Sequence, residues 1–214
     1  MAAIDSLTTF APAWQSGQRR TTLALLGVAA ALAVAAGAFL MRGGDGNAAR
    51  YATMMVFRAS QAAFLLYYLA SPVARLIRTR PTFAVARQRT GLALGFVGMY
   101  AVFLGCSLIP DYMHGAHTPL ATMVFCAFSA VILAAILMGE RAGRADADWR
   151  PAWRAMEVVG VAYFWMIFVA SDLDHMYGPH RPDGFYGLSL MAFVLALLVR
   201  FADAFVERYK LARS

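Results

Sequence analysis

Six long apolar runs, separated by short polar connections, dominate this sequence of 214 residues. A stretch of about 20 mostly apolar residues is long enough to cross the hydrocarbon core of a bilayer as an α-helix. We therefore expect an all-α integral membrane protein, a bundle of six transmembrane helices. The expected spans cover residues 22–41, 51–70, 90–109, 119–138, 153–171 and 186–204.

The composition excludes most soluble classes of protein. Hydrophobic residues make up 61% of the chain and charged residues only 14%, whereas a typical soluble domain has about 25% charged residues. Six spans leave too few residues for a soluble nucleotide-binding or catalytic domain. The net charge of +7 does not indicate nucleic-acid binding, because the basic residues lie between the apolar runs and not in one exposed cluster. The function is therefore expected inside the membrane or at its faces, with lipid as a partner.

The basic residues predict the orientation. Lys and Arg in short loops are retained on the cytoplasmic side, and 15 of the 19 basic residues fall on the side that holds both termini. We therefore expect a multi-pass protein of a bacterial-type inner membrane with two cytoplasmic ends. Its parts would be an N-terminal tail (1–20), the transmembrane domain (21–205) and a C-terminal tail (206–214).

Small residues form stripes on two of the expected helices. In the first span, Gly27, Ala31 and Ala35 recur at four-residue intervals, which allows a neighbouring helix to approach closely. The third span has a glycine stripe that admits either another helix or a planar cofactor, and we favour a helix. The stripe consists of Gly91, Gly95, Gly98 and Gly105.

Two segments carry a family resemblance. Residues 69–76 read Leu-Ala-Ser-Pro-Val-Ala-Arg-Leu, and residues 87–92 read Arg-Gln-Arg-Thr-Gly-Leu. They resemble the end of one helix and the start of the next in the ferric-reductase-like transmembrane family, which includes the haem-carrying membrane subunit of methionine sulfoxide reductase systems. The resemblance runs from about residue 51 to residue 205. It implies a six-helix bundle that passes electrons through b-type haem, held by histidines on the third and fifth spans.

The histidines that the resemblance implies are missing. The family's ligand position on the third span is occupied by Ala101, and the two positions on the fifth span by Glu157 and Ala170. Transfer haems are normally held by axial imidazoles, and none of the six expected spans contains a histidine. The sequence therefore predicts a bundle without a bis-imidazole haem and assigns no catalytic residue.

Two charged residues inside the spans require partners, because an unpaired charge in a membrane is costly. We predict an ion pair between Glu157 and Arg200, with Arg154 as the second choice of partner. Arg58, near the outer end of the second span, is expected to find a counter-charge in Asp172, with Asp111 and Asp174 as alternatives.

All four histidines are expected in two extracytoplasmic loops. Ordinary loop residues or a docking surface are the first interpretation of His114, His117, His175 and His180. A zinc, copper or iron site and an outer haem remain open. Against the outer haem, Pro110 is expected to end its helix before His114.

Two functions follow as hypotheses. The first is a haem-free ferric-reductase-like accessory or scaffold subunit of a larger membrane assembly, respiratory or photosynthetic, with other membrane subunits as partners. The second is a transmembrane electron-transfer or metal-dependent oxidoreductase subunit that uses b-type haem or the outer histidines. A transporter is disfavoured, because the spans show few paired Gly/Pro interruptions.

Overall fold

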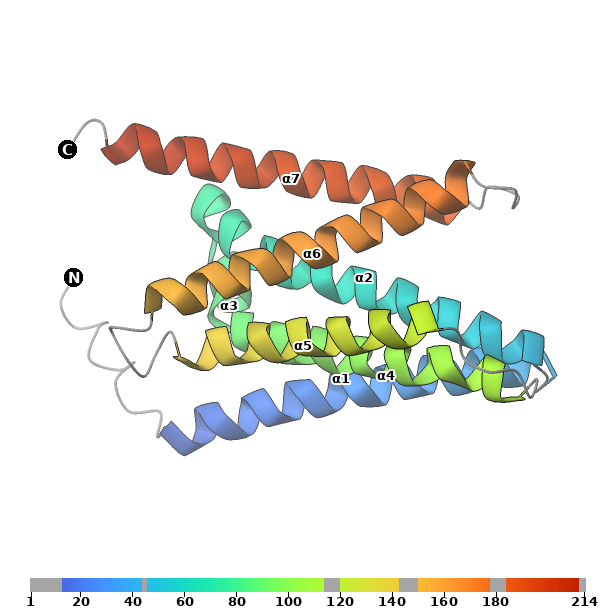
Figure 1. The fold of residues 1–214 in the computed structure, drawn as a ribbon. Coiled ribbons are helices and arrows are strands. Elements are labelled where there is room, and N and C mark those ends of the chain that lie inside the picture. Colours follow the sequence, from blue (N-terminus) through green and yellow to red (C-terminus); the bar gives the residue numbers. More distant parts are fainter. Residues whose placement is uncertain (1–12, 44–45, 114–119, 143–149, 178–183, 212–214) are drawn as a thin grey trace.

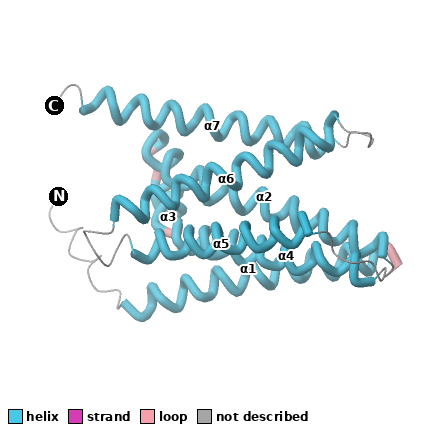
Figure 2. The backbone as a smooth tube through the Cα atoms, in the orientation of Figure 1, coloured by secondary structure: helices cyan, strands magenta, loops and turns pink. Residues whose placement is uncertain are grey.

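The computed structural model describes residues 13–43, 46–113, 120–142, 150–177 and 184–211. These residues are helical apart from short turns, which confirms the all-α prediction for this part of the chain (Figures 1 and 2). The described helices are α1 (Ala13–Met41), α2 (Gly46–Ile77), α3 (Arg80–Arg87), α4 (Arg89–Met113), α5 (Leu120–Ala142), α6 (Arg150–Tyr177) and α7 (Gly184–Leu211).

The six long helices run alternately in opposite directions along one axis (Figure 1). We call the end at which α1 begins and α7 finishes the terminal end, and the opposite end the far end. The short helix α3 lies at the terminal end, in the connection expected between the second and third spans. None of its eight residues is buried.

Four stretches are long and apolar enough to cross a membrane, by length and composition within the described residues. They are Arg89–Ile109, Leu120–Gly139, Ala155–Tyr177 and Gly184–Val206, in α4 to α7. Large apolar side chains on these helices are exposed, among them Val131 and Leu198. Extended apolar surface of this kind is unfavourable in water and favourable in lipid. The protein is therefore a multi-pass helical membrane protein.

The two remaining long helices, α1 and α2, contain no described stretch that is both long and apolar enough to be counted as a membrane span. The described apolar part of α1 is shorter, Leu25–Met41, and α2 is absent from the four. The position of α2 explains its composition, because α2 packs against α1, α4 and α7 and is largely covered by them. A helix surrounded by protein can carry polar side chains such as Ser60 and Gln61, both of them buried.

Two prolines do not end their helices where the sequence suggested. The helix α2 continues through Pro72 to Ile77, so the Ser71-Pro72 pair lies within a helix. The helix α4 continues past Pro110 to Met113. Pro110 has no N–H to donate to the carbonyl of Cys106, four residues earlier. The hydroxyl of Thr53 on α2 lies 3.0 Å from that carbonyl oxygen and can donate to it instead.

The small-residue stripes mediate close packing of α1 against α4. A Cβ atom added to Gly27 would lie 2.7 Å from the carbonyl oxygen and 2.8 Å from the Cα of Gly95. The two backbones therefore touch through glycine. At Gly95 the third-span stripe faces another helix, and no space for a planar cofactor remains between these two glycines.

Gly27→Ala is expected to lower the free energy of unfolding by about 1–3 kcal/mol, because the new methyl group forces two backbones apart. The matched control is Gly37→Ala on the same helix, where an added Cβ meets nothing within 4 Å. This control should leave stability unchanged or raise it by about 0.5–1 kcal/mol through helix propensity. Unfolding by SDS titration in mixed micelles measures both, and equal effects would contradict the close contact.

Candidate functional site

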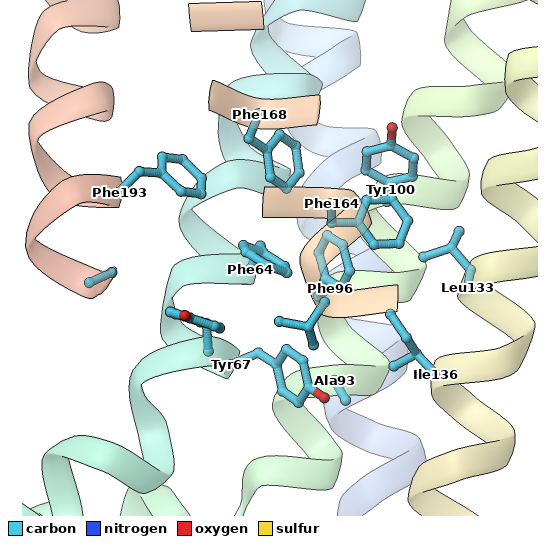
Figure 3. Packing of buried hydrophobic residues seen from close by; sticks show 13 residues of the cluster. Phe64, Tyr67, Ala93, Phe96, Tyr100, Leu133, Ile136, Phe164, Phe168 and Phe193 are labelled. Atoms are coloured by element: carbon cyan, nitrogen blue, oxygen red, sulfur yellow. The ribbon is translucent and has the colours of Figure 1, made fainter. Parts of the chain in front are cut away.

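Aromatic rings fill the centre of the bundle between α2, α4 and α6. In the described residues, the backbone of α6 packs against α5 and α7 but stays apart from α2 and α4. The intervening space is closed by fully buried side chains from three helices (Figure 3). Ring centroids of Phe96 and Phe164 are 5.1 Å apart, those of Tyr100 and Phe164 4.8 Å, and those of Phe64 and Phe168 5.3 Å. These distances are typical of packed aromatic pairs.

The three positions that the resemblance assigns to haem ligands do not meet. Ala101 and Ala170 are both exposed on the outside of the bundle, and Glu157 is partly buried near the terminal end. Alanine has no ligating atom, and the interior between α4 and α6 is occupied by Phe96, Tyr100 and Phe164. The residues present therefore do not fit a haem held between these two helices.

Glu157 is paired, but not with the expected partner. Its carboxylate accepts hydrogen bonds from the Arg89 guanidinium on α4 and from the Tyr67 hydroxyl on α2, the latter at 3.0 Å. Arg200, the predicted partner, lies with its guanidinium 4.7 Å from the ring centroid of Tyr68. The side chain of Arg154, the second choice, is outside the described residues. Pairing with Arg89 was missed because sequence alone does not show which side of α6 faces α4.

Glu157 and Arg200 nevertheless line the same groove. A cavity of about 360 Å³ opens between α6 and α7, which diverge toward the terminal end (Figure 1). Its other lining residues are mostly apolar and include Tyr68, Trp165 and Leu197. The groove thus presents an apolar surface with one carboxylate and one guanidinium.

A second ion pair links α2 to α7 and was not predicted. Arg75 binds Asp203 through two bonds, from Nε to Oδ1 at 2.9 Å and from Nη2 to Oδ2 at 2.5 Å. The Asp203 side chain is only 5% exposed, whereas that of Arg75 is 46% exposed. An acidic residue at the end of an otherwise apolar run was the available signal in the sequence.

A buried polar cluster lies in the half of the bundle nearer the far end. Asp172 on α6 is fully buried and accepts a hydrogen bond from Nε2 of Gln61 on α2 at 2.9 Å. Ser189 of α7 lies beside this carboxyl group, and Arg58 acts on it electrostatically. The Arg58 guanidinium stacks over Phe185 and Tyr186, at 4.4 and 4.8 Å from their ring centroids. Of the candidate partners of Arg58, Asp172 lies in this cluster and Asp174 is exposed, whereas the side chain of Asp111 is outside the described residues.

Three of the four histidines considered for an outer metal or haem site are outside the described residues, namely His114, His117 and His180. His175 does not lie in a loop as expected, because α6 continues to Tyr177 and holds this residue in its last turn. The His175 Nδ1 atom lies 2.8 Å from the Ser171 carbonyl oxygen. Its ring stacks on Tyr186 with a centroid separation of 4.4 Å. No group of three metal-ligating side chains occurs within the described part of the chain.

Comparisons with known protein families, with curated proteins and with solved structures found no match for this chain.

Proposed function

We propose that the chain is a haem-free membrane scaffold, an accessory subunit of a larger respiratory or photosynthetic assembly built on a ferric-reductase-like frame. The observation that carries this proposal is the aromatic core. The space between α2, α4 and α6, where the resemblance implies a haem relay, is filled by the protein's own rings, including Phe64, Phe96, Phe164 and Phe168. A chain of this kind gains stability from its interior and offers its outer faces to lipid and to other subunits.

The proposal includes six spans with both termini in the cytoplasm of a bacterial-type inner membrane. Support for six comes from α1 and α2, which run in opposite directions beside the four helices that are long and apolar enough to cross a membrane (Figure 1). Support for the orientation comes from the arginines near the terminal end, which by the positive-inside rule belongs to the cytoplasm. These arginines include Arg75, Arg78, Arg80, Arg87 and Arg89.

The competing function is electron transfer through haem or a metal site at the outer histidines. A visible absorption spectrum of the full chain, purified in mild detergent, separates the two functions. We expect no Soret band and no pyridine haemochrome. A Soret band with one haem per chain would overturn the scaffold proposal.

Metal content and assembly complete this test. Wild type and the variants His114→Ala and His175→Ala are expected to contain equal amounts of zinc, copper and iron. A stoichiometric metal that is lost in either variant would favour the oxidoreductase.

The tagged chain, extracted from its native membrane, is expected to migrate with other subunits in one complex of fixed stoichiometry. A chain that migrates alone after gentle extraction contradicts the accessory role.

A further inference from the structure

The side chains of Gln61 and Asp172 form a buried pair in which half of the hydrogen-bonding atoms have no partner. Gln61 is 1% exposed and Asp172 is 0% exposed. Gln61 Nε2 donates to Asp172 Oδ1 at 2.9 Å. The two remaining oxygens, Gln61 Oε1 and Asp172 Oδ2, are buried and have no hydrogen-bond partner among the described residues. Both are acceptors when the carboxyl group is ionised.

One proton accounts for both unpartnered oxygens. A protonated carboxyl group gains an O–H donor, and a proton on Oδ2 would allow Asp172 to donate to Gln61 Oε1. The two side chains would then form two parallel hydrogen bonds, acid to amide and amide to acid. A proton fits at this site because it occupies almost no volume, and both oxygens are shielded from solvent. Without this proton, each of the two buried acceptors would lose its hydrogen bonds to water on folding and gain none in the protein.

We propose that Asp172 is a proton-binding site inside the membrane, with Gln61 as its positioning residue. The proton comes from bulk water and is held on Oδ2. This site is independent of the scaffold function and of any haem or metal.

Basic and polar groups from three helices surround the site. Arg58 on α2 and His175 on α6 both act on the Asp172 carboxyl group electrostatically, and the Ser189 hydroxyl of α7 can donate a hydrogen bond to this group. The two basic groups favour an ionised carboxylate. However, the Arg58 guanidinium stacks over Phe185 and Tyr186, and Nδ1 of His175 contacts the Ser171 carbonyl. None of the three residues, Ser189 included, supplies a hydrogen bond to Oδ2. A proton on Oδ2 gives this oxygen a hydrogen bond that the neighbouring residues do not provide.

Infrared spectroscopy of the full chain in lipid nanodiscs tests the proposal directly. At neutral pH we expect a carboxylic C=O stretch that moves to lower frequency in ²H₂O. It should disappear in Asp172→Asn and persist in Asp174→Asn, a matched control because Asp174 is exposed on the same helix. In Gln61→Leu the band should move to higher frequency, since the C=O loses its hydrogen-bond donor. A wild-type spectrum without a band that Asp172→Asn removes would overturn the proposal.

Thermal unfolding in detergent gives a second readout. The amide of Asp172→Asn can donate to Gln61 Oε1 as the protonated acid does, so its midpoint temperature should match that of wild type. Asp172→Leu removes both hydrogen bonds and should lower the midpoint. An Asn variant as destabilised as the Leu variant would show that an ionised carboxylate is required, and would refute the proton site.

Discussion

Replacing Phe164 by alanine is expected to lower the free energy of unfolding by about 3–5 kcal/mol, the range for deleting a buried aromatic ring. Phe164 is fully buried and its ring packs against five others, with centroid distances from 4.8 Å to Tyr100 to 6.4 Å to Phe64. The cavity would not close easily, because the backbone of α6 is kept apart from α2 and α4 by the rings of several residues. Unfolding by SDS titration measures the loss.

Phe201→Ala is the matched control for this prediction. Phe201 lies on α7 and is 65% exposed, so its ring faces the lipid or detergent. Its removal should change the free energy of unfolding by less than about 1 kcal/mol, because little buried contact is lost. If Phe164→Ala costs no more than Phe201→Ala, the central rings do not stabilise the bundle.

Arg75→Gln is expected to lower the free energy of unfolding by about 3–5 kcal/mol, since it leaves the carboxylate of Asp203 buried without its counter-charge. Neutralising the other partner, by Asp203→Asn, should lower the free energy of unfolding by less. Arg75 is 46% exposed and can turn its guanidinium toward water and lipid headgroups. The difference between the two variants arises from the unequal burial of the two partners.

A double-mutant cycle tests this inequality. The variant that combines Arg75→Gln with Asp203→Asn should be more stable than Arg75→Gln alone, because no buried charge remains. Arg87→Gln serves as the control, since Arg87 is exposed on α3, and it should leave stability within about 0.5 kcal/mol of wild type. Equal losses for Arg75→Gln and Asp203→Asn would contradict the argument from burial.

Each expected span falls on a separate helix over the residues that the structure describes, because helix formation in lipid depends on properties local to the run. Length, apolar content and the need to satisfy backbone groups within one segment are all visible in the sequence. The small-residue stripe around Gly27 likewise predicted the close approach of a neighbouring helix, and the structure identifies that helix as α4.

The partners of the buried charges could not be predicted in this way. The sequence showed that Glu157 and Arg58 need compensation, but it named Arg200 as the partner of Glu157, whereas the structure gives Arg89 and Tyr67. It also overlooked the Arg75–Asp203 pair and the hydrogen bond from Gln61 to Asp172. Such choices depend on how each helix is rotated and which helix lies beside it. These are set by long-range packing.

The sequence by itself thus determined the environment, the helical class and the absence of imidazoles from the expected spans. The tertiary structure alone decided that α2 packs against α1, α4 and α7, that rings fill the space between α2, α4 and α6, and that Asp172 meets Gln61. The physical reason is the distance along the sequence over which each interaction acts. Partition into lipid and backbone hydrogen bonding are determined within about 20 consecutive residues. Contacts between helices join residues that are far apart in the sequence, as in Gln61 and Asp172, which are separated by 111 positions.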